Sequence, residues 1–369
     1  MFIIARLHSL CTSINNRINN SPGNRPKMFK FKKISLILIS CAYIVSASLQ
    51  AQSEDSSGSA QIVSETNKPL NELIKPLPTQ SEIDPQMVDL GRKLFHDKRL
   101  SGDDTISCAS CHALSTGGVD NQVTSLGIHG QRGPINSPTV FNSGYNFVQF
   151  WDGRVATLEE QADGPVNNPL EMGSNWVQVL EKLNQDPEYL KTFDKLFNDG
   201  LSPENIQKAI ADYERSLITP NSRFDQYLNG NPDAISAQEK SGYELFKSVG
   251  CITCHMGINV GGNMYQKMGL FGDYFADRDG KVTEADLGRY NVTKIEGQKH
   301  FFKVPSLRNI DKTAPYLHDG SQKTLENTVR LMAKYQLNKN LSEKEVSDIV
   351  AFLKTLTGEY ILTKEELEQ

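Results

Sequence analysis

The body of this 369-residue chain has few cationic residues. Residues 1–53 contain seven of the 39 Lys and Arg and no acid, which leaves 32 basic against 44 acidic residues, a formal charge near −12. Such an acidic body argues against a nucleic-acid partner and favours a protein partner with a basic surface. Strand signals are scarce as well, and proline and glycine punctuate long loops such as GQRGPINSPTV. The composition therefore predicts an all-α protein with long loops and little strand.

The chain also lacks an apolar run long enough to cross a bilayer comfortably. Its most apolar stretch, ISLILISCAYIVSA (34–47), follows the basic MFKFKK (28–33) and precedes a polar segment. This order is typical of an export signal, so residues 1–51 are predicted to be a presequence, with Met28 as the start, and the protein to be periplasmic. Lipid anchoring at Cys41 is the alternative. Residues 52–82, rich in Ser, Gln, Glu and Pro, are predicted to form a flexible linker.

Cysteine is sparse and strictly placed. Outside the presequence the chain has only four, arranged as two C-x-x-C-H motifs, in SCASCHALS and GCITCHMGI. Two disulfides, a redox dithiol or a zinc site could each use such pairs. The histidine that follows both pairs favours covalent haem, in which each cysteine bonds to the porphyrin and the histidine binds iron. The predicted attachment residues are Cys108, Cys111, Cys251 and Cys254, with His112 and His255 as axial ligands.

Each motif follows a predicted helix, as at the start of a cytochrome c domain. DPQMVDLGRKLF and SAQEKSGYELF have apolar residues at helical spacing and capping residues at Asp84 and Ser236. A closing helix is predicted in LSEKEVSDIVAFLKTLTG, capped by Ser342 and stopped by Gly358. We expect two cytochrome c-like haem domains, an N-terminal one at 83–230 and a C-terminal one at 231–369.

Longer blocks carry a resemblance to a known family. These are CASCHALSTGGVDNQVTSLGIHGQRGPINSPTVFN, QFWDGRVATLEEQADGPVNNPLEM, LITPNSRFDQYL, CITCHMGINVGGN and VPSLRNIDKTAPYLHDG. Together they resemble the bacterial dihaem cytochrome c peroxidases over about residues 84–358. The resemblance implies a peroxide-reducing N-terminal haem and a C-terminal haem of higher potential that receives electrons.

In the N-terminal domain, the resemblance implies that His129 is the removable distal ligand of the first haem. The family pattern departs here, because GIHGQ puts His129 seven residues before Asn136 where eight is usual. Glu171 matches the acid–base residue that moves a proton during cleavage of the peroxide bond, and Gln161 matches an amide that helps to hold peroxide. Sequence alone would class Glu171 as a surface loop acid.

In the C-terminal domain, the resemblance implies that Met332 is the distal ligand, although a methionine on a helix is usually a core residue. Trp151 matches an aromatic between the haems, with domain packing as the plainer alternative. A calcium ion is implied between the domains, with Asn136, Thr313 and Pro315 as ligands. His318 matches a residue near the second haem, whereas His96 and His300 are predicted to be structural.

The expected function is the reduction of hydrogen peroxide to water, with electrons from a small cytochrome c or cupredoxin. A homodimer is expected from the resemblance. Two alternatives stay open at this point. One is a dihaem electron-transfer cytochrome without turnover. The other is a protein-oxidising dihaem enzyme, a class that has tyrosine where this chain has Met332.

Overall fold

The computed structural model describes residues 69–278 and 280–367, and the predictions for the presequence, Met28, Cys41 and positions 52–68 lie outside these residues. The described part is mostly helical, and its one sheet has two short antiparallel strands, which confirms the predicted class. The helices and strands are α2 (Pro85–Phe95), α3 (Cys108–Cys111), α4 (Leu158–Asn167), α5 (Trp176–Leu183), α6 (Pro187–Leu196), α7 (Pro203–Ser216), α8 (Arg223–Leu228), α9 (Ala237–Val249), β1 (Tyr265–Lys267), α10 (Tyr274–Asp277), α11 (Tyr290–Thr293), β2 (Phe301–Lys303), α12 (Leu325–Leu337), α13 (Glu343–Lys354) and α14 (Lys364–Leu367). Among them, no helix is both long and apolar enough to cross a membrane.

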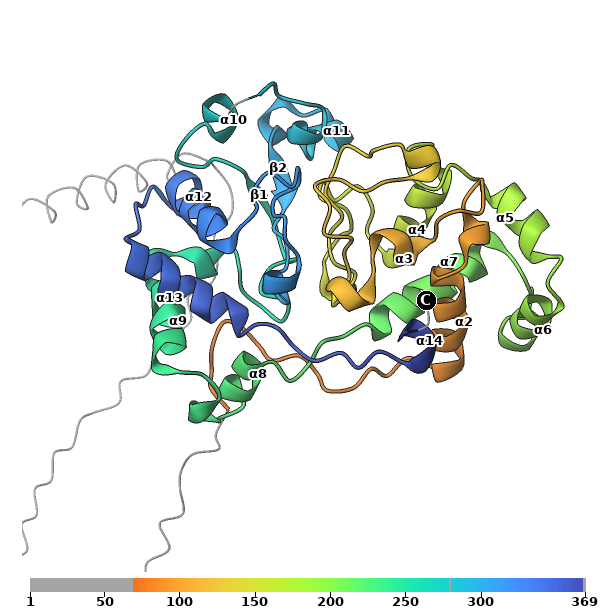
Figure 1. Cartoon of the computed structure of the whole chain (residues 1–369), viewed down its shortest axis with the longest axis horizontal. Coiled ribbons are helices and arrows are strands. Elements are labelled where there is room, and N and C mark those ends of the chain that lie inside the picture. The colour runs from red at the N-terminus through yellow and green to blue at the C-terminus, as the bar shows by residue number, and fades with distance from the viewer. Residues whose placement is uncertain (1–68, 279, 368–369) are drawn as a thin grey trace, which may run out of the picture. The chain divides into compact units, whose positions relative to one another are not determined.

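The N-terminal haem domain is built on the crossing of α2 and α7, which lie side by side in Figure 1. The predicted cap is present, since the Asp84 carboxylate accepts a hydrogen bond from the backbone N–H of Gln86 at 2.9 Å. Gly91 sits at the crossing, where a Cβ would come within 1.9 Å of the Ala209 carbonyl oxygen. Only a residue without a side chain allows this approach.

The C-terminal haem domain has a similar close crossing of two helices, α9 and α13, at a glycine. Ser236 and Ser342 form the predicted caps, each in a capping box with the glutamate three residues on. Gly242 lies at the crossing, where a Cβ would meet the Asp348 carbonyl oxygen at 1.9 Å. The prediction that Gly358 stops the closing helix is wrong: α13 ends at Lys354. Gly358 instead packs on the backbone of Thr219, where a Cβ would approach its carbonyl oxygen to 1.8 Å.

The segment before the N-terminal domain packs on the C-terminal domain, and the segment after the C-terminal domain packs on the N-terminal domain. Residues 70–77 pack on the C-terminal domain, where the Leu73 carbonyl accepts a hydrogen bond from the backbone N–H of Gly257 and Ile74 is fully buried. This part of the predicted linker is therefore fixed rather than free. In the opposite direction, Tyr360 packs against the N-terminal core and the Tyr213 hydroxyl donates to the Glu366 carboxylate at 2.6 Å. Figure 1 shows both crossings, in orange before α2 and in blue between α13 and α14.

The predicted N-terminal domain ends at residue 230, and its last helix packs on the C-terminal core. Helix α8 lies before that position, yet Phe224 packs on Tyr243 and Phe352 in the C-terminal core. A buried ion pair fixes α8 there, because Arg308 makes two hydrogen bonds to the carboxylate of Asp225. Both side chains are almost completely shielded from solvent, and a paired charge is the form in which such groups tolerate burial.

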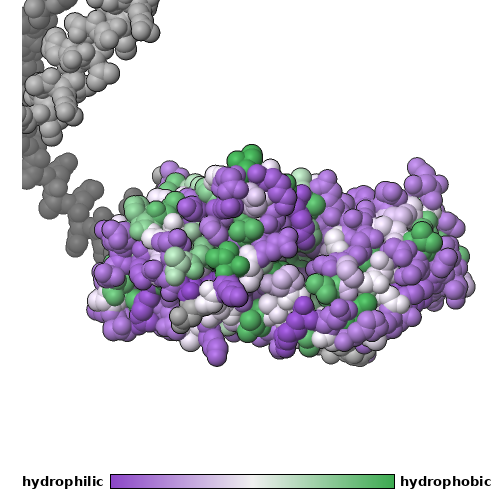
Figure 2. Space-filling view, turned by 90° about the horizontal axis from the view of Figure 1, so that it is seen from above, coloured by the Kyte–Doolittle hydropathy of each residue, from purple (hydrophilic) through white to green (hydrophobic). Residues whose placement is uncertain are grey.

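The surface of the described part is mostly hydrophilic on the face drawn in Figure 2, where hydrophobic side chains form small separate patches. Leu270 and Phe271 are among the exposed apolar side chains of the described residues, and they stand next to each other in the chain. Both also border the cavity of the C-terminal domain. An apolar rim of this kind can contact a partner protein.

Candidate functional site

The first C-x-x-C-H motif folds as one short helical turn, α3. Ser107 caps this turn, and its backbone N–H bonds to the hydroxyl of Ser110. His112 follows, with its Nδ1 atom 3.4 Å from the carbonyl oxygen of Gly118. The Ser137 hydroxyl lies 3.4 Å from both ring nitrogens. A carbonyl acceptor favours the proton on Nδ1, the tautomer in which Nε2 can bind a metal.

In the second motif the histidine is held in the same way, although the cysteines lie on a 3-10 turn rather than on an α-helical turn. The left-handed Gly250 ends α9 and turns the chain into the motif, and the Nδ1 atom of His255 lies 3.3 Å from the Val260 carbonyl oxygen. Burial lowers the pKa of His255 to about 4, against the opposing effect of carbonyl hydrogen bonds, and burial likewise lowers the pKa of His112. Both rings are therefore neutral at pH 7, as a metal-binding imidazole must be.

All four motif cysteines are free thiols in the structure, so no disulfide joins them. Burial raises the pKa of Cys111 and of Cys251 to about 11 each. Redox dithiols instead have a lowered thiol pKa, which positively charged surroundings produce. Their burial beside the histidines fits attachment to an enclosed cofactor.

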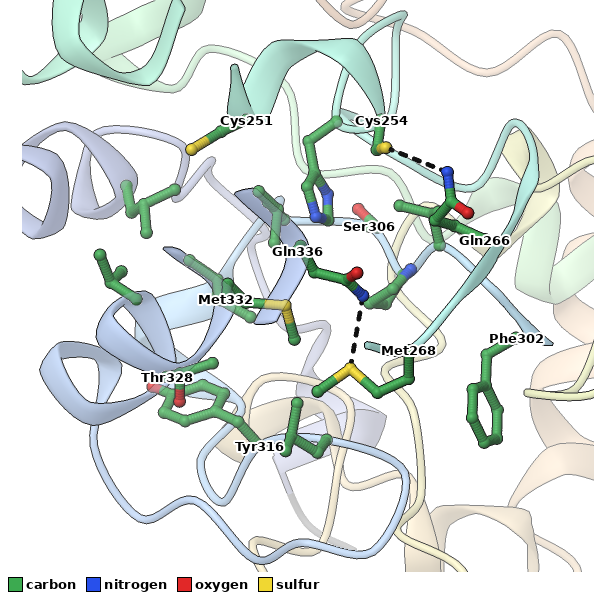
Figure 3. A pocket seen from close by; sticks show the side chains of 18 of the residues that line it. Cys251, Cys254, Gln266, Met268, Phe302, Ser306, Tyr316, Thr328, Met332 and Gln336 are labelled. Atoms are coloured by element: carbon green, nitrogen blue, oxygen red, sulfur yellow. Dashed lines mark hydrogen bonds between the residues drawn. The ribbon is translucent and has the colours of Figure 1, made fainter. Parts of the chain in front are cut away.

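A cavity of about 510 Å³ opens beneath the second motif, and it lies within the usual ~300–1,000 Å³ range of cofactor sites. In Figure 3, Cys251 and Cys254 project from one wall while the sulfur of Met332 enters from the opposite side. Most of its lining is apolar, with Leu325, Val329 and Leu353 among the contributors. Two cysteines, a neutral histidine and an opposing thioether are the donor set that haem c requires, so the residues present fit this group.

Sequence reasoning missed a second methionine in this cavity. Met268, which follows β1, is buried and lines the same space as Met332. Its sulfur accepts a hydrogen bond of 3.4 Å from Nε2 of Gln336, which lies one helical turn beyond Met332 on α12 (Figure 3). No sequence motif marks Met268, because only the pairing of β1 with β2 brings it to the cavity. The ligand role of Met332 stays a prediction.

Trp151 belongs to the N-terminal half of the chain but lines the C-terminal cavity. Its indole N–H donates to the carbonyl oxygen of Asn136 at 2.9 Å, and its ring meets that of His318 edge to face at 6.3 Å. His318 is buried, stacks on Phe302 and forms a 2.8 Å contact with the carboxylate of Asp286. His318 also lines the cavity, and its position near the second haem stays a prediction.

The three predicted calcium ligands all line this cavity. The amide N–H₂ of Asn136 donates to the carbonyls of Gln122 and Val123, which leaves its Oδ1 atom free. The side-chain amide of Asn121 donates hydrogen bonds to the carbonyl oxygens of Lys312 and Ala314. The carbonyl oxygens of Thr313 and Pro315, which alternate with these along the chain, accept no hydrogen bond from the described residues. Free oxygens of this type suit calcium, whose binding here stays a prediction.

Glu171 lies in the loop that folds back on α4. The backbone N–H groups of Met172 and Ser174 bond to the carbonyls of Pro165 and Val166. The side chain of Asn168 donates to Oε1 of Glu171 at 2.7 Å. Burial raises the pKa of the Glu171 carboxyl, while this hydrogen bond and the charge of Arg154 act to lower it. The Cys111 sulfur lies 4.0 Å from the carbonyl oxygen of Leu126, two residues before the Ile128 that bonds to Glu171, so this loop packs on the segment beside the first motif.

The turn that contains His129 packs on the Glu171 loop. The backbone N–H of Ile128 donates to the carbonyl oxygen of Glu171 at 2.9 Å, and a Cβ on Gly127 would come within 2.0 Å of the Leu170 carbonyl oxygen. His129 has a left-handed backbone with φ 56°. Its side chain is 65% exposed, and Nδ1 lies 3.4 Å from Asp103. Iron ligation by His129 stays a prediction that this conformation does not display.

Gln161 sits half-buried in the middle of α4, the helix onto which the Glu171 loop folds. A capping box between Thr157 and Glu160 fixes the start of this helix. The first motif, the His129 turn, Gln161 and Glu171 thus come from four separate segments of one domain. The Glu171 loop and α4, which carries Gln161, pack together in this domain, and the roles of both residues stay predictions.

Comparison with known proteins shows the family of this chain. Residues 85–233 match the family model of di-haem cytochrome c peroxidase, and residues 239–357 match that of cytochrome c. Cytochrome c peroxidase Ccp of Escherichia coli is 51% identical over 291 residues, which cover 79% of this chain and 62% of that protein. Cytochrome c551 peroxidase of Nitrosomonas europaea is 48% identical over 291 residues, which cover 78% of this chain and 85% of that protein.

A solved structure has the same fold. It is a MauG-like protein associated with microbial copper homeostasis, with a TM-score of 0.68 and 29% sequence identity. The match covers 80% of this chain and 97% of that one. Since the match includes four fifths of this chain, it extends over both of its domains.

Proposed function

Since the chain belongs to the bacterial di-haem cytochrome c peroxidases, which carry two haem c groups, we propose that it reduces hydrogen peroxide to water. The balanced reaction is H2O2 + 2 e⁻ + 2 H⁺ → 2 H2O. The observation that supports turnover, rather than electron transfer alone, is the half-buried carboxyl of Glu171, on a loop that packs on the segment beside the first C-x-x-C-H motif. A carrier that only passes electrons has no use for such a group.

When bound, the haems supply an iron that binds peroxide and a route for electrons to reach it. Cys108, Cys111 and His112 would hold the peroxide-reducing haem, with His129 as its removable distal ligand. Cys251, Cys254, His255 and Met332 would hold the other. Asn136, Thr313 and Pro315 would bind Ca2+ between them, and Trp151 would lie on the path of the electrons.

Glu171 has the chemical role of moving a proton. The oxygen–oxygen bond breaks readily when the proton on the inner oxygen is transferred to the outer one, which then leaves as water. An ionised carboxylate can take the first proton and return it. Asn168 holds Oε1 of Glu171 in place at 2.7 Å, and the amide of Gln161 would hold peroxide beside it.

We propose a small cytochrome c or cupredoxin as the electron donor, bound weakly and briefly. The acidic body favours a basic donor surface, so the rate of electron transfer should fall as salt rises. Export by the presequence would place the enzyme in the periplasm. We expect a homodimer.

The test is Glu171→Gln, which keeps the shape of the side chain and its contact with Asn168 but removes the basic oxygen. We expect peroxide turnover to fall by about 10²–10⁴-fold while the spectra of both haems stay unchanged. The matched control is Glu181→Gln, which changes an exposed carboxylate on α5. Wild-type turnover in the Glu171 variant would refute its role as the proton carrier. If the wild-type protein never turns over peroxide, the proposed activity is refuted and electron transfer without turnover remains as the function.

A further inference from the structure

Lys303 is the one lysine among the described residues that line the cavity of the C-terminal domain. Among the described residues that line this cavity there is no other Lys or Arg and no Asp or Glu. Lys303 ends β2, pairs with Tyr265 of β1, and donates its backbone N–H to the carbonyl oxygen of Trp151 at 2.8 Å. These contacts fix the residue on the cavity wall. The sequence gives no hint of this, because the strand is only three residues long.

The ammonium group of Lys303 is buried without a partner. The residue is only 6% exposed, and among the described residues its ammonium group has no hydrogen bond or salt bridge. The Asp152 carboxylate favours the charged form from a distance, but its own oxygens are taken by Arg154 at 3.1 and 3.2 Å. Burial lowers the pKa of Lys303 to about 8, so most molecules keep the charge at pH 7.

A buried charge is costly unless an opposite charge lies beside it. The protein supplies no such group, so the occupant of the cavity has to bring one. A haem c held at Cys251 and Cys254 carries two propionate groups on the porphyrin edge that is not joined to the cysteines. A propionate in contact with an ammonium gains the short, strong hydrogen bond of a charge-assisted pair.

We propose that Lys303 binds a propionate of the C-terminal haem and, through its positive charge, raises the reduction potential of that haem. The inference rests on the proposed attachment of haem at Cys251 and Cys254 and deepens the electron-accepting role given to that site. A cation near the iron favours the reduced state, which carries one positive charge less. The low dielectric of an apolar cavity strengthens the effect.

The experiment uses the fully matured protein and two uncharged variants, Lys303→Met and Lys303→Gln, together with Lys303→Arg. The control is Lys267→Met, which removes an exposed lysine from the neighbouring strand of the same sheet. Midpoint potentials are measured by spectroelectrochemical titration, and propionate bending modes by resonance Raman spectroscopy. We expect both uncharged variants to lower the potential of the C-terminal haem and to shift its propionate mode. Lys303→Arg and Lys267→Met should keep both values close to wild type.

Each outcome decides the matter. Wild-type potential and propionate mode in Lys303→Met or Lys303→Gln would overturn the proposal. Loss of the second haem from the uncharged variants, with retention in Lys303→Arg, supports it, because charge is then needed to hold the group. Loss from all three variants points to packing alone and overturns it. A protein that shows the shift but never reduces peroxide would refute the proposed activity and leave this contact standing.

Discussion

The side-chain amide of Asn168 lies 2.7 Å from Oε1 of Glu171, and it is the hydrogen-bond donor that holds this carboxylate. Asn168 is itself held, because its carbonyl group Oδ1 accepts the backbone N–H of Leu170 at 3.0 Å. The two contacts form a compact turn at the end of α4. Since an amide donor stabilises the ionised form of a carboxyl, Asn168 opposes the effect of burial on Glu171.

We predict that Asn168→Ala shifts the acidic limb of the pH–rate profile to higher pH. Glu171 must be ionised to accept a proton, so kcat/KM rises as pH passes through its pKa. Removing the amide raises that pKa further, and activity at low pH falls more than activity at high pH. The measurement is kcat/KM for peroxide across the acidic and neutral range.

The matched control is Asn167→Ala, one residue earlier on α4. The Asn167 amide bonds to Asp163 and is exposed, with no contact to Glu171. Its profile should stay at the wild-type position. If Asn168→Ala merely lowers activity by one factor at every pH, Asn168 does not act on the titration of Glu171.

Glu214 gives a second prediction, on stability. This α7 residue is buried, and burial raises its pKa to about 8, although the charge of Arg215 acts in the opposite direction. An unfolded glutamate ionises at its ordinary pKa near 4.5. Above that pH the unfolded chain releases a proton that the folded protein keeps, so this residue makes the folded state less stable as pH rises toward 8.

We therefore expect Glu214→Gln to become more stable relative to wild type as pH rises from 4.5 to 8. The free-energy difference grows by about 1.4 kcal/mol for each pH unit in this window at most. Thermal unfolding of both holoproteins at several pH values measures it, with Glu181→Gln as the exposed control. A difference in Tm that does not change with pH would show that Glu214 is ionised in the folded state.

Local features of the fold were predictable from sequence, and distant contacts were not. The caps at Asp84, Ser236 and Ser342 depend on residues within one helical turn, so spacing alone reveals them. The burial of Ile74 against the C-terminal domain and of Glu366 against Tyr213 joins segments far apart in the chain. The polar composition around Ile74 predicted a free linker, but the burial of Ile74 and backbone hydrogen bonds to Gly257 hold this segment on the C-terminal domain.

The candidate site divides in the same way. Each C-x-x-C-H motif can be recognised from five adjacent residues. The roles proposed for Asn168, Met268 and Lys303 depend instead on contacts with residues far from them in the chain or on their position in the cavity. Met268 and Lys303 reach the cavity because β1 and β2 pair, and a three-residue strand is too short to give a reliable sequence pattern. Such residues are found from the structure, by asking which polar groups face an apolar cavity.

The two thioethers of the C-terminal cavity lead to the last prediction, which concerns the identity of the axial ligand. Met332 and Met268 both line the cavity, but the Met268 sulfur already accepts a hydrogen bond from Gln336. Met332 has no such partner among the described residues, so its sulfur is the freer to bind iron. We expect Met332→Leu to abolish the methionine–iron charge-transfer band of the oxidised protein and to lower the potential of the second haem. Met268→Leu, a change of similar volume in the same cavity, should keep the band. Optical spectra and potentiometric titration of the two variants provide the measurement. Loss of the band in Met268→Leu, with retention in Met332→Leu, would reverse the assignment and make Met268 the ligand.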